Sequence, residues 1–222
     1  EDSLRASAEQ GIFVLADGLG GHRCGEVASQ AAVDAIFTGM AQAEALEEAS
    51  LLDLFRSANK ELLRRQAQPG QEEMRTTAVA LKLAGSTAVW AHIGDSRLYR
   101  FSNGELAGVT ADHSVTYRKF LGGEISYMDV YHDDDRSRLL RVLGKEPCRP
   151  EAGQAAVSPG DAFLLCSDGF WEFVYNEEIQ ADLCRARTPE EWAEGMLLRH
   201  IRRTPPGSDN FSLITVFVEA CG

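Results

Sequence analysis

The sequence predicts an α+β protein whose sheets are mainly antiparallel. Helical patterns fall into two groups, at residues 26–66 and 176–201, and short apolar runs typical of strands lie before, between and after these groups. A strong hairpin signal, Asn103-Gly104, joins two of the apolar runs. Helices and strands that are segregated along a chain favour this class over an alternating α/β architecture.

The first third of the chain predicts one strand followed by two helices. Residues 11–16 form a continuous apolar run, which is typical of a buried strand, and the polar stretch before it is not expected to form one. Residues 26–40 repeat apolar side chains at helical spacing and are expected to end at Gly39-Met40. Residues 44–66 carry a longer apolar stripe that Pro69-Gly70 closes.

The middle of the chain predicts four short strands in an antiparallel meander, followed by an irregular segment. The strands are expected at residues 77–83, 86–94, 97–101 and 105–110. Short helices are expected near residues 115–121 and 138–142. Because an irregular segment inside a compact domain is often functional, residues 112–147 are predicted to form a flap over the site.

The last third predicts two strands, two helices and a final strand. They are expected at residues 155–157, 162–166, 176–183, 189–201 and 211–219. No linker or shift in composition divides the chain, so we expect one domain over residues 1–222.

The charge balance excludes some partners. The chain has 34 Asp and Glu against 22 Lys and Arg, a formal net charge of −12, which argues against nucleic acid or an anionic membrane as the main partner. The five cysteines show no C-x-x-C spacing and are odd in number, which favours reduced thiols inside a cell. No apolar stretch approaches 18 residues, and a cytoplasmic location is expected.

Several acids share one setting, because Asp17, Asp95, Asp168 and Asp209 lie at the ends of expected strands beside Gly or Asn. Asp2 precedes the first core strand. Each alone is a common turn residue. Together, strand-end carboxylates from distant parts of a chain are how a fold builds a site for a hard cation, since Mg²⁺ and Mn²⁺ prefer oxygen ligands.

The motifs around these acids carry a family resemblance. The stretch Ala16-Asp17-Gly18-Leu19-Gly20-Gly21-His22, with Gly25-Glu26-Val27-Ala28-Ser29 after it, resembles the signature of metal-dependent Ser/Thr protein phosphatases of the PPM (PP2C-like) family, bacterial type. The resemblance continues in order through Thr76-Thr77, Gly94-Asp95-Ser96-Arg97, Thr110-Ala111-Asp112-His113-Ser114, Arg141-Val142-Leu143-Gly144, Ser167-Asp168-Gly169 and Asp209-Asn210.

The resemblance implies a sandwich of two antiparallel sheets flanked by helix pairs, with two Mn²⁺ or Mg²⁺ ions at one end and a third, weaker ion. It makes Asp17 the bridging ligand, Gly18 a carbonyl ligand, Asp168 and Asp209 ligands of the first ion, and Asp2 a ligand through water. Asp95 contributes to the third site. The resemblance also implies that the attacking water is activated by the ions that Asp17, Asp168 and Asp209 hold. It makes His22 a weaker candidate for proton transfer.

Other residues have bracing or flanking roles. Asp112, His113 and Ser114 are assigned to the flap and the substrate. Arg97 is expected to brace its loop rather than to bind substrate. Trp171 is expected in the core.

The implied function is hydrolysis of phosphoserine and phosphothreonine in proteins, in line and without a phosphoenzyme. The expected partners are phosphorylated proteins and a Hanks-type kinase that the enzyme opposes, and a monomer is expected. Two alternatives stay open: a partner-switching phosphatase for a phosphoserine regulator, and a non-enzymatic pseudophosphatase. A cysteine phosphatase is excluded, because no cysteine has an Arg six positions later.

Overall fold

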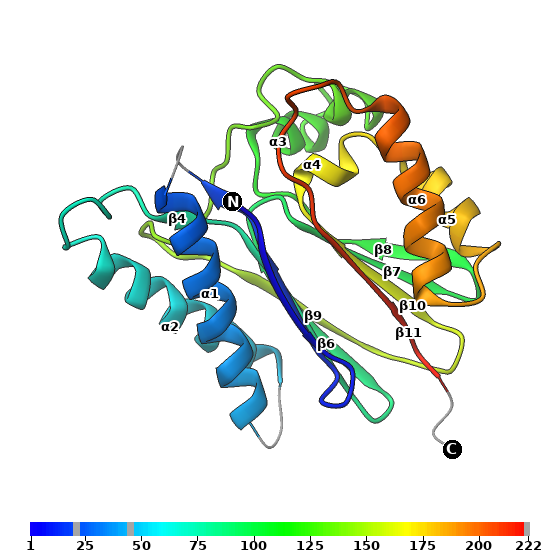
Figure 1. Cartoon of the computed structure of the whole chain (residues 1–222), viewed down its shortest axis with the longest axis horizontal. Helices are drawn as coiled ribbons and strands as arrows, with labels where there is room; N and C mark the ends of the chain where they lie inside the picture. Colours follow the sequence, from blue (N-terminus) through cyan, green and yellow to red (C-terminus); the bar gives the residue numbers. More distant parts are fainter. Residues whose placement is uncertain (20–22, 44–46, 220–222) are drawn as a thin grey trace.

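Two antiparallel sheets lie face to face, and a pair of helices covers the outer face of each (Figure 1). The computed structural model describes residues 1–19, 23–43 and 47–219, apart from the side chain of Arg23. The five-stranded sheet has the order β1-β2-β5-β6-β9, and the four-stranded sheet has the order β11-β10-β7-β8. The architecture confirms the predicted α+β sandwich.

The elements have the following bounds. The five-stranded sheet consists of β1 (Ser3–Ser7), β2 (Ile12–Ala16), β5 (Ala78–Ala84), β6 (Thr87–Ile93) and β9 (Glu151–Ala156). The four-stranded sheet consists of β7 (Arg97–Ser102), β8 (Glu105–Val109), β10 (Ala162–Cys166) and β11 (Leu213–Phe217), and a small ribbon pairs β3 (Gly18–Leu19) with β4 (Arg75–Thr76). The helices are α1 (Arg23–Gln42), α2 (Glu48–Arg65), α3 (Val115–Leu121), the 3₁₀ helix η1 (Met128–Tyr131), α4 (Asp168–Trp171), α5 (Asn176–Leu183) and α6 (Pro189–Arg203).

Strand β2 shows how alternating side chains build two neighbouring cores. Ile12, Val14 and Ala16 pack in the core beneath α1 and α2. Phe13 and Leu15 belong to the layer between the two sheets. Because successive side chains of a strand point to opposite faces, a strand buried on both faces is apolar throughout. This explains the continuous apolar run that predicted the strand.

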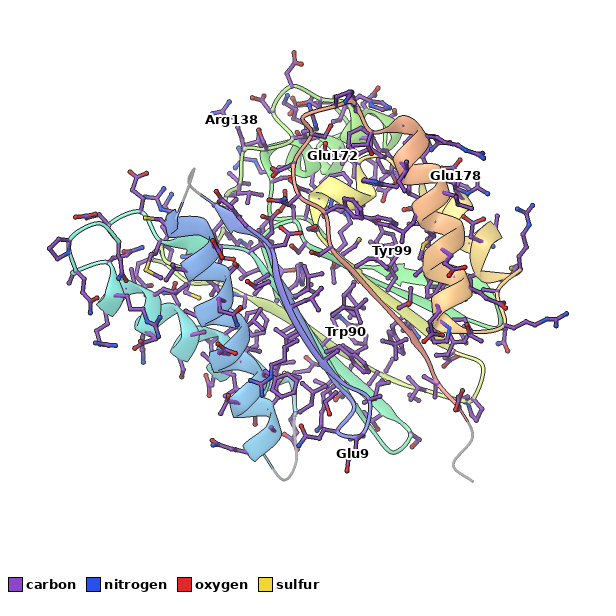
Figure 2. The ribbon with its side chains drawn as sticks, viewed as in Figure 1. Glu9, Trp90, Tyr99, Arg138, Glu172 and Glu178 are labelled. Carbon is purple, nitrogen blue, oxygen red and sulfur yellow. The ribbon has the colours of Figure 1, made fainter. Side chains whose placement is uncertain are left out.

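A third core lies between the four-stranded sheet and helices α5 and α6. Tyr99 and Phe101 of β7 reach it together with Trp192 of α6. Figure 2 shows Tyr99 beside this helix pair, whereas Trp90 of β6 lies between the sheets. Three apolar layers therefore separate four layers of secondary structure.

Helices α1 and α2 approach closely at Gly39. A Cβ atom at this position would lie 2.4 Å from Cδ2 of Leu54, so a larger residue would force the Leu54 side chain to move. Gly39 does not end α1, which continues to Gln42, and the predicted end at Gly39-Met40 is wrong. Glycine was selected here for close packing rather than as a helix stop. The start predicted for the next helix, residue 44, lies outside the described residues.

The turn Asn103-Gly104 forms the predicted hairpin between β7 and β8, with positive φ angles of 53° and 78°. The predicted meander is wrong at one place, because β6 and β7 pair in different sheets. The chain crosses between the sheets at Gly94, whose φ is 103° and whose added Cβ would lie 2.6 Å from Cγ2 of Thr77. The crossing places Asp95 at the end of the sandwich.

Four other expectations differ from the structure. The strand expected at residues 155–157 is β9, which begins earlier, at Glu151, and ends at Ala156. Strand β1 was not predicted, because it is an edge strand whose side chains are largely exposed and show no apolar pattern. Residues 138–142 are not helical and instead contain the bridge between Ser114 and Leu139. The short helix α4 was not predicted. Among the described residues, no helix combines the length and the apolar character needed to cross a membrane.

Candidate active site

Asp17 directly follows β2, and two threonines fix its main chain. The amide of Thr77 donates to the Asp17 carbonyl over 2.8 Å, and Oγ1 of Thr76 donates to the same oxygen over 2.7 Å. In return, the Asp17 amide donates to Oγ1 of Thr77 over 3.0 Å. The side chain of this residue is buried, with 8% exposed. Asp17 is therefore held by the end of β4 and the residue that joins it to β5.

Glycine is required in the segment after Asp17. A Cβ atom on Gly18 would lie 2.2 Å from the carbonyl oxygen of Gly25, in the first turn of α1. The chain thus passes against the start of this helix with no room for a side chain. Gly20, Gly21 and His22, the candidate for proton transfer, lie outside the described residues.

Asp168 begins α4 directly after β10, and its neighbours tie three segments together. Oγ of Ser167 donates to Oδ2 of Asp2 over 2.7 Å. A Cβ atom on Gly169 would lie 2.1 Å from the carbonyl oxygen of Asn210. The beginning of the chain, the start of α4 and the segment before β11 therefore meet at one place, although they are far apart in sequence.

Asp95 and Asp209 stand at the two extremes of exposure. Asp95 is 3% exposed, and its carbonyl accepts from Nε1 of Trp171 over 2.9 Å. Asp209 is exposed, and one of its carboxylate oxygens accepts from the Asn210 amide over 2.8 Å. The acids thus extend from the interior of the sandwich to its surface.

The electrostatics show that these aspartates are neighbours. Burial, and then the carboxylates of Asp168, Asp2 and Asp95, together raise the pKa of Asp17 to about 11. Burial also raises the pKa of Asp168, with Asp209 and Asp2 acting in the same sense. The pKa of Asp95 lies well above its usual value for the same reason, burial first and Asp168 second. The structure therefore brings all five predicted aspartates into one cluster.

This donor set fits the divalent ions that the sequence motifs imply. Buried carboxylates that raise one another's pKa need either protons or a cation to be stable together. Oxygen donors of this kind suit Mg²⁺ and Mn²⁺. Gly18, which packs against Gly25 of α1, follows Asp17 directly and adds a main-chain carbonyl oxygen to the possible donors.

Arg97 braces the site from beneath, as expected. Its guanidinium makes a bidentate ion pair with Asp112, at 2.9 and 2.6 Å, and lies 3.5 Å from the ring centroid of Trp171. Trp171 is 2% exposed and belongs to a core, as expected. A fully buried ion pair of this geometry links the Asp95 turn, the base of the flap and α4.

The three flap residues of the sequence motif are buried. Asp112 pairs with Arg97, and His113 stacks on His92 with 4.7 Å between the ring centroids. Ser114 caps α3 by accepting from the amide of Tyr117 over 3.1 Å. These contacts anchor the flap, and a direct contact of these residues with substrate stays a prediction.

Sequence reasoning missed Glu172, which follows α4 near the cluster, at the end of the sandwich opposite Glu9 (Figure 2). Burial, and then the carboxylate of Asp168, raise the pKa of Glu172 to about 6, while Arg136 of the flap pairs with it over 2.9 Å. Both residues line a pocket of about 390 Å³. The signal was present in the sequence, since Glu172 lies four residues after Asp168, one helical turn later.

Comparisons with known proteins agree with this geometry. The family model "Protein phosphatase 2C" matches residues 1–197. The "Serine/threonine phosphatase stp" of Listeria monocytogenes is 33% identical over 214 residues, which cover 93% of this chain and 84% of the relative. The crystal structure of the Mycobacterium tuberculosis serine/threonine phosphatase PstP/Ppp is 32% identical, covers 99% of this chain and 92% of its own, and superposes with a TM-score of 0.86.

A second solved structure bears on the aspartate cluster. It is the catalytic domain of the serine/threonine protein phosphatase PstP in complex with two manganese ions, 29% identical, with a TM-score of 0.84 and coverage of 98% of this chain and 91% of its own. The order of the strand-end aspartates, the four-layered sandwich and these matches lead to one conclusion. The chain belongs to the protein phosphatase 2C family of serine/threonine phosphatases.

Proposed function

We propose that this chain removes the phosphoryl group from phosphoserine and phosphothreonine side chains of proteins at the aspartate cluster. The observation that carries the proposal is the meeting of Asp2, Asp17, Asp95, Asp168 and Asp209 at one end of the sandwich. These residues come from five separate segments of the chain. Buried like charges are costly, and a fold keeps them where a cation compensates them.

The cluster would hold two Mn²⁺ or Mg²⁺ ions, and a third more weakly. Asp17 would serve both main ions, the Gly18 carbonyl would bind one of them, Asp168 and Asp209 would bind the first, and Asp2 would act through water. Asp95 would serve the third ion. When bound, such ions activate water and offset the charge of the phosphoryl group.

The residues of the chain supply rigidity and position. Asp17 is fixed through its main chain by Thr76 and Thr77, so the point from which its carboxylate extends is held in place. Ser167 orients Asp2 by donating to its carboxylate. Ligands that are held in place before substrate arrives avoid the cost of reorganisation during the reaction.

The flap, residues 112–147, would select protein substrates at the edge of the cluster. It contacts the segment after α4 through the ion pair of Arg136 and Glu172, next to the pocket that both line. Small phosphate esters would not reach across this pocket. The flap would therefore affect phosphoproteins more than small esters.

The physiological role we favour is opposition to a kinase of the Hanks type by a monomeric, cytoplasmic enzyme. A partner-switching phosphatase that acts on one phosphoserine regulator uses the same chemistry. Phosphoproteomics of cells lacking the protein separates the two, since the first predicts many changed sites and the second predicts one. Light scattering behind size exclusion tests the monomer.

A metal-dependence assay tests the reaction itself. We expect the protein to hydrolyse p-nitrophenyl phosphate and phosphothreonine peptides with Mn²⁺ and to stop in excess EDTA. Activity retained under EDTA would contradict the proposal. No turnover with any divalent ion, combined with binding of phosphopeptides, would favour the pseudophosphatase.

A further inference from the structure

The most compact group of potential metal ligands in the described part of the chain lies outside the aspartate cluster. His92, His113 and Glu151 each offer one ligand atom, and these atoms all lie within 4.8 Å of one another. His92 of β6 and Glu151 of β9 are direct partners in the sheet, while His113 comes from the base of the flap. Three segments thus converge on this group.

Both imidazoles present a buried nitrogen that nothing in the described residues satisfies. Nδ1 of His92 has no hydrogen-bond partner among the described residues, and Nε2 of His113 has only Oε1 of Glu151 near it, at 3.4 Å and without hydrogen-bond geometry. The two residues are only 4% and 6% exposed. A buried polar atom without a partner is costly and needs an explanation, such as an ion that it binds.

The hydrogen bonds fix which nitrogen carries the proton. Nε2 of His92 lies 2.9 Å from the Ala111 carbonyl, and a carbonyl only accepts, so this nitrogen donates and Nδ1 has a free lone pair. The Gly94 amide donates to Nδ1 of His113 over 3.1 Å, so neutral His113 carries its proton on Nε2. Burial lowers the pKa of both histidines, which keeps them neutral, as metal ligands must be.

Glu151 completes the group and gives it access to solvent. Its side chain is 49% exposed, and Oε1 lies 3.4 Å from Nε2 of His113 and 2.5 Å from Nη1 of Arg141. No hydrogen bond within the described residues engages Oε2. Arg141, which pairs with Glu151, is a charged neighbour that would oppose a cation here.

We propose that His92, His113 and Glu151 form a second metal site, for a borderline transition-metal cation of the Zn²⁺ class. Two imidazoles and one carboxylate are a common ligand set for zinc, and three protein ligands leave one position for water. The aspartate cluster offers only oxygen and suits harder ions. The two sites would therefore prefer different classes of metal ion.

Binding would move one proton without releasing it. To act as a ligand, His113 would first have to transfer its proton from Nε2 through solvent to Nδ1, which frees the Nε2 lone pair and ends the hydrogen bond that Nδ1 accepts from Gly94. One hydrogen bond is a small loss against a metal–ligand bond. Because Gly94 precedes Asp95, a metal at this site would shift the turn that carries an acid of the first cluster.

The test is a zinc titration of the full chain in excess Mg²⁺, which fills the oxygen site. X-ray absorption of bound Zn²⁺ should show imidazole nitrogen, and the NMR signal of the Gly94 amide should move. Glu151→Gln should weaken Zn²⁺ binding at least tenfold, as expected for loss of a ligand. Glu105→Gln, on the exposed edge strand β8, is the matched control and should change nothing.

Two further variants sharpen the test. His113→Gln should abolish the imidazole signal, and Arg141→Gln should tighten binding by on the order of tenfold, because it removes a nearby positive charge. The proposal would be overturned if X-ray absorption showed only oxygen ligands around Zn²⁺. Equal Zn²⁺ affinity of the Glu151 and Glu105 variants would also overturn it. Since Glu151 is half-exposed, its variant keeps the test valid even if the His113 variant does not fold.

Discussion

The aspartate cluster and the His92–His113–Glu151 group are built in opposite ways. The aspartates stand at the ends of strands, where chain segments from residue 2 to residue 209 meet. The histidine group lies across two paired strands, beneath the flap. Burial raises the pKa of Asp17 but lowers that of His113. Burial therefore disfavours the charged carboxylate of Asp17 unless a cation compensates it, and it keeps the imidazole of His113 neutral.

This difference teaches what each place in a sandwich can do. Strand ends are open, so several acids can meet there and still face water and substrate. A position within a sheet is closed, so it can hold only a few ligands in fixed register. The first setting suits chemistry on a large substrate, and the second suits a structural or regulatory ion.

The largest expected effect concerns the aspartate cluster alone. Asp168→Asn should lower phosphatase activity by on the order of 10²–10³-fold, because one ligand and its charge are lost where charge stabilisation matters most. Zinc binding at the histidine group should stay unchanged. The measurements are p-nitrophenyl phosphate turnover with Mn²⁺ and the zinc titration described above.

Asp53→Asn, on the exposed face of α2, is the control for this variant. It should retain full activity. Equal losses in both variants, or a parallel loss of zinc binding in Asp168→Asn, would show that the loss of activity does not come from a missing ligand of the aspartate cluster.

A smaller effect concerns the histidine group and pH. The pKa of His113 falls from 6.5 to about 4 on folding, mainly through burial and then through His92. The unfolded chain therefore binds more protons between these values, so the free energy of unfolding is intact above pH 6.5 and declines as pH falls toward 4. The shift corresponds to about 3 kcal/mol.

Urea denaturation of the metal-free protein at several pH values measures this loss. His113→Gln should flatten the dependence between pH 6.5 and 4. His132→Gln replaces an exposed histidine of the flap and should leave the dependence as it is. An unchanged slope in the His113 variant would show that this residue is not held neutral by folding.

The smallest effect concerns the flap, which supplies His113 to one site and contacts Glu172 near the other. Arg136→Ala breaks the ion pair with Glu172, and such a pair is worth roughly 0.2–1 kcal/mol. The KM for a phosphoprotein should therefore rise up to about fivefold, while turnover of p-nitrophenyl phosphate stays the same. Steady-state kinetics with both substrates measure the split.

Arg138→Ala offers a matched control, because Arg138 pairs only within the flap, with Asp135, and its side chain is 68% exposed. It should change neither substrate. If Arg136→Ala slowed both substrates equally, the flap would not act as a selector of proteins.

The sequence predicted the parts of the fold that repeat a local pattern. The apolar run of β2, the stripes of α2 and α6 and the turn Asn103-Gly104 each follow a rule that needs no knowledge of distant residues. Strand β1 was not predicted, because an edge strand with exposed side chains shows no such pattern. The crossing of the chain between the two sheets at Gly94 was not predicted, because a turn between paired strands and a turn between sheets look alike in sequence.

The two sites differ in the same way, because one shows a local sequence pattern and the other depends on the pairing of distant residues. The aspartates could be found because each stands beside Gly or Asn after an apolar run, within motifs of known order. The histidine group could not, since it depends on the pairing of His92 with Glu151, and the start of β9 was predicted four residues too late. A cross-strand pair becomes visible only when the register is known.

The burial of β2 on both faces has a consequence for how this protein can change length. Inserting or deleting one residue within β2 would turn Phe13 and Leu15 toward the helices and send their neighbours between the sheets. It would also turn Asp17 away from the cluster. Length variation among related chains should therefore collect in turns at the far end of the sandwich, where Glu9 lies (Figure 2), and be absent from the five residues before Asp17.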